Sequence, residues 1–366
     1  MQTDDFSRFG IDLVSDQCRN PWEFSAEMLQ RVSRTFALNI KVLPAKRLRE
    51  PVLLAYLFCR MADTIEDCPH FNAAEKGDLL GRFSAVFTGE ASGWDVRAKS
   101  FQDALPPQWK TSQDDNEFLC AHASWSIALF HSFPQNVQAP IVQCIREMCD
   151  GMAQFAQRQE SLQGAWLTIE NEQDLDQYCY FVAGVVGNLL CDLFYAQSRW
   201  IGERSHQKMR ALAVSFGLAL QVTNITKDVQ EDSERKVCFL PKNWILQAGF
   251  SNPEMLFASA TVEQQRQVMR PMILKAWRHL QDSLDFTLLI PSIEPRIRLF
   301  CLWPMLMAAE TLVETGDGTP IFVKDHKVKI SRATVKRIIR QTTWHCWQGS
   351  WLRKQMAHLR SRSIAI

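Results

Sequence analysis

The stretch Asp63-Thr64-Ile65-Glu66-Asp67 has a counterpart with the same D-x-x-E-D pattern in Asp228-Val229-Gln230-Glu231-Asp232. Both pentads lie inside apolar segments with helical periodicity. Positions i, i+3 and i+4 share one face of a helix, so each pentad directs three carboxylates the same way. Like charges this close are unfavourable unless cations lie between them, and Mg²⁺ commonly joins carboxylates to phosphate oxygens. Two such clusters facing one another would form a metal-loaded site for a diphosphate leaving group.

Other polar side chains continue the face of each pentad. Four of them line one side of the first helix at i, i+4, i+7 and i+11: Tyr56, Arg60, Asp63 and Asp67. Asn224 precedes the second pentad by one helical turn. An internal ion pair between Arg60 and one of the aspartates is the alternative interpretation of the first face. A single pentad could be a helix cap, but two, each preceded by a polar residue, predict paired metal sites.

Helical periodicity continues from Pro21 almost to the end of the chain, and strand signals are weak. We predict an all-α protein with one domain over residues 1–366, since no linker interrupts the pattern. The predicted helices cover 21–32, 33–43, 49–66, 73–87, 115–132, 137–158, 175–195, 208–231, 261–289, 296–314 and 334–358. Gly89, Gly93, Pro106 and Pro107 predict an irregular loop over 88–112.

Composition and charge narrow the cellular setting. Hydrophobic residues make up 46% of the chain, and no run reaches the ~18 apolar residues that span a bilayer. The acidic N-terminus is not followed by an apolar stretch, and the 11 cysteines form no C-x-x-C pair. We therefore expect no signal peptide, reduced thiols and a cytoplasmic protein, either soluble or peripheral at a membrane.

The charge is unevenly distributed along the chain. The net charge is +1, yet residues 324–366 hold 11 of the 41 basic residues and one of the 40 acidic residues. Such a basic tail suits anionic lipid headgroups or cofactor phosphates. A solvated helix face is the alternative.

Two further segments carry less specific signals. Ser33-Arg34-Thr35-Phe36 offers a hydroxyl and a guanidinium to phosphate oxygens, although a helix cap with a surface arginine is the default interpretation. The segment 178–187 is aromatic and then small, with Gly184 and Gly187 inside a predicted helix. Glycine there costs ~1 kcal/mol relative to alanine, so a kink, an approaching apolar ligand or tight helix packing is required.

Together, four stretches resemble the squalene/phytoene synthase family over roughly residues 25–345. They are S-R-T-F at 33–36, Y-x-x-x-R-x-x-D-T-I-E-D at 56–67, D-x-x-x-Y-C-x-x-V-A-G-x-V-G at 174–187 and T-N-I-x-K-D-x-x-E-D at 223–232. Two more stretches, 299–308 and 328–332, are similar to the squalene synthase branch.

The resemblance implies an all-α isoprenoid synthase fold with a central cavity for two molecules of farnesyl diphosphate. It implies Mg²⁺, with Mn²⁺ as the alternative ion, held by Asp63, Glu66, Asp67, Asn224, Asp228 and Asp232. It implies substrate contacts from Ser33, Arg34, Phe36, Tyr56, Arg60, Val182, Gly184, Asn224, Lys227, Phe300, Pro304 and Met307. Tyr178 would be the catalytic proton acceptor, acting beside the catalytic Asp63, Asp67, Asp228 and Asp232, and Lys329 and Arg332 would bind NADPH phosphates.

The implied reaction joins two farnesyl diphosphates head to head through presqualene diphosphate, and NADPH reduces the intermediate to squalene. The alternatives are condensation without reduction, giving presqualene diphosphate, dehydrosqualene, phytoene or hydroxysqualene, and a relative without catalytic activity. No nucleic acid partner is expected. Lys227 stands where the family usually has an arginine, and Ser331 stands where it usually has a basic residue. Arg235 or Lys236 would replace an arginine missing after the second pentad.

The predicted basic C-terminal helix, about 334–360, carries a tryptophan stripe. Trp344, Trp347 and Trp351 follow at i, i+3 and i+7, with Arg340, Arg353 and Lys354 beside them. Tryptophan with basic neighbours is typical of a membrane interface. Packing of the three rings in the core is the alternative.

Overall fold

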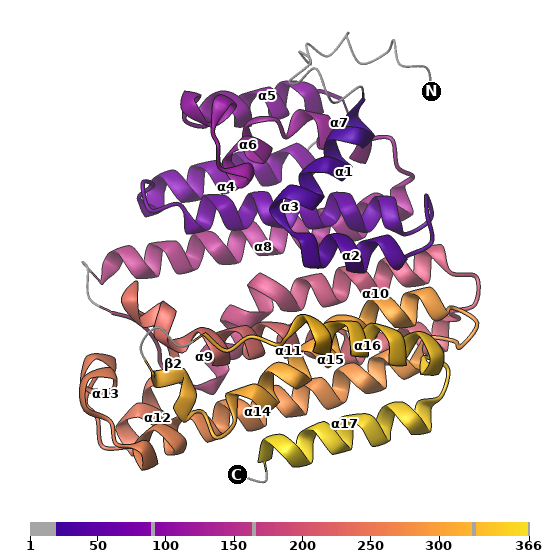
Figure 1. Cartoon of the computed structure of the whole chain (residues 1–366). Helices are drawn as coiled ribbons and strands as arrows, with labels where there is room; N and C mark the ends of the chain where they lie inside the picture. Colours follow the sequence, from indigo (N-terminus) through magenta and orange to yellow (C-terminus); the bar gives the residue numbers. More distant parts are fainter. Residues whose placement is uncertain (1–19, 89–91, 163–165, 324–326, 365–366) are drawn as a thin grey trace. The chain divides into compact units, whose positions relative to one another are not determined.

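The computed structural model of the chain describes residues 20–88, 92–162, 166–323 and 327–364. Within these residues helices dominate, which confirms the all-α prediction (Figure 1). Two compact units divide the chain, unit 1 over Met1–Glu160 and unit 2 over Ser161–Ile366. The single domain over the whole chain stays a prediction. The acidic N-terminus, on which the expectation about a signal peptide depends, lies outside the described residues.

Unit 1 is built from helices that enclose an aromatic core. Its elements are α1 (Pro21–Val32), α2 (Arg34–Val42), α3 (Arg49–Asp67), α4 (Ala73–Thr88), α5 (Trp94–Ala104), η3 (Pro107–Thr111), α6 (Asp115–Ala121), α7 (Ser124–Phe130) and α8 (Gln135–Ser161). Phe58 of α3 is fully buried and makes edge contacts with Phe83 at 6.5 Å and Phe130 at 5.9 Å between ring centroids. This packing fixes the apolar side of α3, so the polar side with Asp63 faces away from the core.

Two predictions in unit 1 are wrong. The interval 88–112 contains α5 and η3 instead of an irregular loop. Gly93, at φ +80°, begins α5, and Phe101 packs 5.0 Å from Phe83, so a tertiary contact stabilises a helix of weak periodicity. The single helix predicted over 115–132 is interrupted at His122, whose backbone leaves the helical region.

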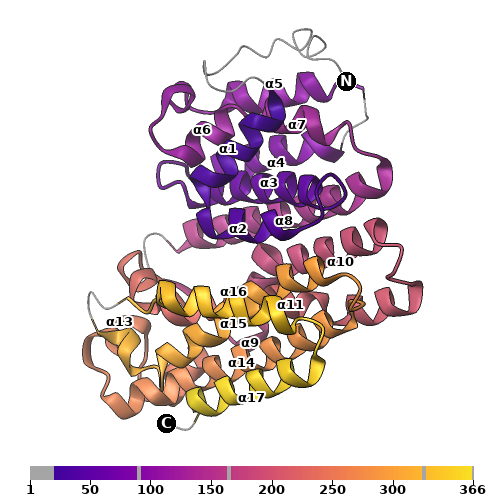
Figure 2. The ribbon, with the colours of Figure 1, turned by 45° about the vertical axis from the view of Figure 1, so that its right-hand side comes forward.

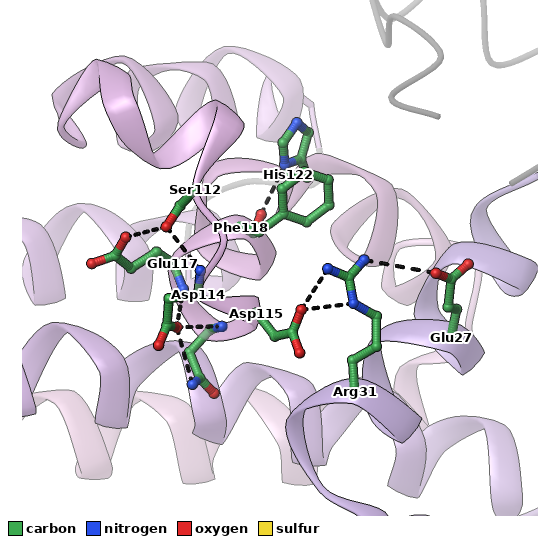
Figure 3. Close-up of polar contacts among 9 residues, drawn as sticks. Glu27, Arg31, Ser112, Asp114, Asp115, Glu117, Phe118 and His122 are labelled. Carbon is green, nitrogen blue, oxygen red and sulfur yellow. Dashed lines mark hydrogen bonds and ion pairs between the residues drawn. The ribbon is translucent and has the colours of Figure 1, made fainter. Parts of the chain in front are cut away.

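A polar network attaches α6 to the end of α1 (Figure 3). The Arg31 guanidinium donates to Asp115 at 2.7 Å and lies 5.3 Å above the Phe118 ring. Asp114 caps α6 by accepting from the backbone N–H groups of Asn116 and Glu117. The network fixes the C-terminal end of α1, directly before Ser33.

Unit 2 is a larger helical layer with one short parallel strand pair. Its elements are β1 (Leu167–Ile169), α9 (Glu172–Cys179), η4 (Tyr180–Gly184), α10 (Val185–Gln197), α11 (Glu203–Glu234), β2 (Val237–Pro241), α12 (Lys242–Gln247), α13 (Pro253–Ser259), α14 (Val262–Leu289), α15 (Pro295–Thr315), η5 (Thr319–Phe322), α16 (Arg332–His345) and α17 (Gly349–Ile364). The long helix α11 packs against α10, α14 and α15, and α17 runs along α14 and α15 in both views (Figures 1 and 2). Phe216 of α11 stacks on Phe286 of α14 at 5.2 Å.

The basic C-terminal helix predicted over about 334–360 is two helices, α16 and α17. The break falls at residues 346–348, because the carbonyl of Cys346 accepts from the buried Arg298 guanidinium at 3.0 Å instead of continuing the helix. The tail therefore folds back along the unit.

One helical stretch, Glu172–Gln197, is 26 residues long and apolar enough to cross a membrane by length and composition. The stretch contains Gly184, Gly187, Asn188 and Asp192, so it is not an uninterrupted apolar run. Half of its most apolar window is buried inside the unit, as in a core helix.

Candidate active site

The first carboxylate cluster occupies the last turns of α3 in unit 1. Arg60 Nη1 lies 4.0 Å from Asp63 Oδ2, so the ion pair considered from the sequence is present, at the limit of direct contact. Tyr56 lies one turn earlier on α3; burial lowers the pKa of Arg60, and the neighbouring Tyr56, Asp63 and Asp67 raise it by more. The Lys76 ammonium of α4 donates to the backbone carbonyl of Glu66, which satisfies one carbonyl at the helix end.

The electrostatics of this cluster favour an added cation. Desolvation raises the pKa of Asp63 to about 7, Arg60 lowers this pKa and Asp67 raises it. The Arg60 guanidinium therefore does not offset the desolvation of Asp63. The donors Asp63, Glu66 and Asp67 are all carboxylate oxygens, the ligands preferred by Mg²⁺. The set fits a magnesium ion.

The Ser33–Phe36 segment lies beside this cluster. Ser33 is the N-cap of α2, accepting from the Phe36 backbone N–H at 3.4 Å, so the capping interpretation is correct for Ser33. The Phe36 ring lies 5.0 Å from the Tyr56 ring, and the Arg34 side chain is exposed. Unit 1 thus brings together the phosphate-binding candidates of α2 and α3.

The second carboxylate cluster occupies the C-terminal part of α11 in unit 2. Asp232 is buried, Asp228 is half-buried, and Asn224 and Glu231 are exposed. Its donor oxygens also fit Mg²⁺. Three basic residues contact its carboxylates: Lys227 bonds Asp228, Arg235 bonds Asp232 at 2.6 Å, and Lys327 bonds Glu231.

These contacts set the charge of the second cluster. The hydrogen bond from Lys327 lowers the pKa of Glu231, and the charges of Lys227 and Lys329 add to this effect. Burial raises the pKa of Asp232, and Arg235 opposes the rise. Arg235, one of two residues expected to replace a missing arginine, therefore lies at the cluster.

The basic stretch predicted to bind NADPH phosphates lies directly after Lys327, whose ammonium bonds Glu231 of the same cluster. Lys329 and Arg332 are exposed, and Arg332 begins α16. Ser331, which departs from the family pattern, is the N-cap of α16 and accepts from the Thr334 backbone N–H at 3.0 Å. A lysine or arginine could not provide this cap, which gives the substitution a physical reason.

Tyr178 lies near the end of α9, where its ring stacks on Phe239 of β2 at 4.5 Å. The buried Lys275 of α14 holds α9 in place by binding Asp176 at 2.6 Å and Glu172 at 2.9 Å. The role of Lys275 could not be predicted from the sequence, because its two carboxylate partners belong to a distant segment. Phe239 was missed for the same reason, since its role appears only when β2 pairs with β1.

Tight packing explains the glycines after Tyr178. A Cβ atom at Gly187 would lie 1.9 Å from the Ala213 carbonyl oxygen, and one at Gly217 would lie 2.1 Å from the Ala183 carbonyl oxygen. The tight-packing interpretation is therefore confirmed for Gly187. The helix also widens into the π-helical turn η4 between α9 and α10.

The apolar residues predicted to contact the substrate differ in how exposed their side chains are. Phe300 is buried and makes an edge contact with Phe194 at 6.0 Å, whereas Val182, Pro304 and Met307 are half-buried. A separate cavity of about 760 Å³, bordered by Arg270 of α14 and Arg360 of α17, contains none of the predicted site residues. The central cavity for two prenyl chains stays a prediction.

The helical architecture is the all-α isoprenoid synthase fold, and the enzymes with this fold that the chain matches are prenyltransferases. A solved structure described as TcSQS with the ligand BPH1237 aligns with a TM-score of 0.73 and 22% identity, covering 94% of this chain and 98% of that one. A crystal structure of a dehydrosqualene synthase aligns with a TM-score of 0.61 and 21% identity, covering 96% of this chain and 100% of that one. Likeness at these identities concerns the fold alone.

The sequence model described as Squalene/phytoene synthase matches residues 29–334, and the chain belongs to this family. The squalene synthase of Nicotiana benthamiana is 29% identical over 88% of this chain and 70% of its own length. The squalene synthase of Schizosaccharomyces pombe is 29% identical over 84% and 62%, and that of Homo sapiens is 27% identical over 83% and 66%. The chain thus spans about 60 to 70% of the length of these relatives.

Proposed function

We propose that the protein joins two molecules of farnesyl diphosphate head to head through presqualene diphosphate and reduces the product to squalene with NADPH. Mg²⁺ is the proposed metal, and Mn²⁺ is the alternative. The family membership and the two complete carboxylate clusters support the condensation. They also argue against a relative without catalytic activity, which would not need to retain both clusters.

The clusters and their basic neighbours would share the work of binding diphosphate. When bound, Mg²⁺ would supply positive charge that stabilises the departing diphosphate. Arg34 and Arg60 have guanidinium groups that can contact two phosphate oxygens at once, and Lys227 adds a single-point contact. Ser33 and Tyr56 offer hydroxyl donors from the same part of unit 1.

Tyr178 is the proposed proton acceptor. Stacking on Phe239 orients its ring, and the contacts of Lys275 hold α9, so the phenol oxygen keeps a defined position. The half-buried Val182 and Pro304 and the buried Phe300 would exclude water from a carbocation, which water would otherwise quench. Gly184 would contribute by letting this helical segment pack closely on α11, since an added Cβ would lie 3.1 Å from Leu218 and from Val214.

The contact between Lys327 and Glu231 is the observation that carries the reductive step. It attaches the basic segment with Lys329 and Arg332 to the second carboxylate cluster, so a nicotinamide cofactor bound there would be near a diphosphate bound by Asp228. Ser331 caps α16, so its departure from the family pattern has a structural reason and does not argue against the cofactor.

The test is to incubate the purified full chain with farnesyl diphosphate and Mg²⁺, with and without NADPH, and to identify the products by mass spectrometry. We expect squalene with NADPH and presqualene diphosphate or an unreduced triterpene without it. Lys329→Gln combined with Arg332→Gln should lower squalene formation while preserving farnesyl diphosphate consumption. Lys336→Gln combined with Lys354→Gln, which changes two exposed lysines of α16 and α17, is the matched control.

Identical products with and without NADPH would refute the reductive step and leave the alternative, condensation without reduction. No consumption of farnesyl diphosphate with either metal would refute the condensation and favour a relative without catalytic activity. We also propose a cytoplasmic protein peripheral at a membrane, because the product is apolar.

A further inference from the structure

Three helix connections meet at one end of unit 2. They are residues 198–202 between α10 and α11, 290–294 between α14 and α15, and 346–348 between α16 and α17, and together we call them the loop end. They lie together on the right-hand side of Figure 1.

Buried polar contacts join the three connections. The Ser198 hydroxyl donates to the Glu294 carboxylate at 2.6 Å, which links the first connection to the second. The buried Arg298 guanidinium donates to the Ile290 carbonyl at 2.8 Å and to the Cys346 carbonyl at 3.0 Å, which links the second to the third. Side chains on the loop end are therefore presented from a fixed backbone.

Large apolar side chains project into solvent from this fixed backbone. Exposure is 46% for Trp200, 58% for Ile293, 68% for Trp344 and 49% for Trp347. Packing in the core, the alternative considered from the sequence, is therefore wrong for Trp344 and Trp347. Trp351 is half-buried and stacks on His345 at 4.5 Å, so it does not belong to the exposed set. Each of the three connections thus exposes a large apolar side chain, and a cluster of such side chains on a folded protein indicates an interaction surface.

The charges around these rings are mostly basic. Arg199 lies 4.7 Å above the Trp200 ring, and three more exposed arginines flank the connections: Arg204, Arg296 and Arg340. Glu294, the one carboxylate within the connections, is buried and bonded to Ser198. The exposed Glu203 at the start of α11 is bonded to the Tyr195 hydroxyl. A partner for the loop end must therefore accept apolar rings and also carry negative charge.

We propose that the loop end is a docking surface for a lipid bilayer with anionic headgroups. Tryptophan favours the boundary between headgroups and acyl chains, and arginine binds lipid phosphate. Trp200, Ile293, Trp344 and Trp347 would enter the boundary, and the arginines would remain at headgroup level. A second copy of the chain would meet the loop end with like positive charge, which disfavours it as the occupant. The proposal rests on the membrane association proposed above and names the surface that makes the contact, but it is independent of the proposed catalysis and needs no substrate.

The experiment is flotation of the purified full chain with vesicles of phosphatidylglycerol and phosphatidylcholine, compared with vesicles of phosphatidylcholine alone. We expect binding to the anionic vesicles that weakens as salt is added. Trp344→Ser combined with Trp347→Ser should lower the partition coefficient at least about tenfold, since the variant loses the two rings that would be buried in the bilayer. Arg199→Gln combined with Arg340→Gln should reduce the preference for anionic vesicles.

Leu246→Ser is the matched control, because Leu246 is 51% exposed on α12, which precedes the start of α14 at the opposite end from the loop end. It should bind vesicles like the parent. Circular dichroism of each variant checks that the fold is retained. Equal flotation of the tryptophan variant and the parent would overturn the proposal. A parent that does not float but forms a dimer dissociated by the tryptophan changes would also overturn it, in favour of a second copy.

Discussion

The two carboxylate clusters have the same sequence spacing but different electrostatic surroundings. In the α3 cluster, Arg60 lies 4.0 Å from Asp63, and the pKa of Asp63 is raised to about 7. In the α11 cluster, Lys227, Arg235 and Lys327 each bond a different carboxylate. In the first cluster the Arg60 guanidinium does not offset the burial of Asp63, whereas in the second cluster Asp228, Glu231 and Asp232 each contact a basic side chain.

This difference indicates different roles in loading the metal and the substrate. A cation entering the α3 cluster relieves repulsion between Asp63 and Asp67, so we expect metal binding there to be the more favourable. A cation that enters the α11 cluster competes with the ammonium and guanidinium groups already bonded to its carboxylates. These groups must release the carboxylates, for example by binding phosphate oxygens of the substrate instead. The α11 cluster therefore suits a metal that arrives with its diphosphate.

The largest effect is expected when either cluster loses one carboxylate. Asp63→Asn and Asp228→Asn should each lower the rate of diphosphate release at least about a thousandfold, because each removes charge that holds the metal. The measurement is steady-state release of diphosphate from farnesyl diphosphate. Asp103→Asn, an exposed aspartate of α5 paired with Lys99, is the control and should leave the rate unchanged. If either cluster variant turns over like the parent, that cluster does not hold an essential metal.

The helix that carries the second cluster depends on glycine contacts, so the next effect concerns stability. Gly187→Ala should lower the free energy of unfolding by about 1–3 kcal/mol, because the new methyl group meets the Ala213 carbonyl and α10 must move from α11. Urea unfolding followed by circular dichroism measures this change. Gly81→Ala in α4 is the matched control, since within the described residues no heavy atom beyond its chain neighbours and its own helix backbone lies within 4 Å of the added Cβ. It should stabilise the helix by about 0.5–1 kcal/mol, and similar losses at both sites would contradict the packing argument.

The pH dependence of stability should distinguish the clusters. The folded pKa of Asp63, about 7, lies above its unfolded value of about 3.9. Between these values the folded state binds more protons, so the contribution of Asp63 to stability falls as pH rises. In chelator, the Asp63→Asn variant should therefore gain Tm relative to the parent between about pH 5 and about pH 8.

Asp228→Asn is the control for this profile, because the Asp228 carboxylate lies against the Lys227 ammonium. It should show no such gain. Comparing each variant with the parent cancels the opposite contribution of His131, whose pKa is lowered to about 4 by burial. If the Tm difference between Asp63→Asn and the parent does not change with pH, the proposed electrostatic difference between the two clusters is refuted.

The smallest effect is expected from removing one exposed cation. Lys327→Met should strengthen Mg²⁺ binding about two- to fivefold, because loss of the ammonium at Glu231 leaves more negative charge beside the ligand Asp228. Isothermal titration of Mg²⁺ measures the change. Lys76→Met is the counterpart at the first cluster, where the lysine donates to a backbone carbonyl, that of Glu66. Equal changes in both variants would mean that the ion pair at Glu231 does not limit metal binding.

Much of the helical structure was predictable, because it depends on local periodicity. The helix over residues 21–32 was predicted with the bounds of α1, and the helix over 49–66 differs from α3 by one residue. The errors concern elements that tertiary contacts stabilise: α5, the pair of β1 with β2, and the break between α16 and α17. Phe101, Lys236 and Arg298 make the contacts that decide these elements, and each partner lies elsewhere in the sequence.

The sequence by itself determined the helical class, the family resemblance and the grouping of three carboxylates on one face of α3 and of α11. These features follow from the 3.6-residue period of a helix, which fixes the directions of nearby side chains. Only the tertiary structure decided that Lys327 reaches Glu231, that Lys275 holds α9, and that Trp344 and Trp347 point into solvent. Charge compensation and burial depend on neighbours from other segments, and no local pattern specifies them.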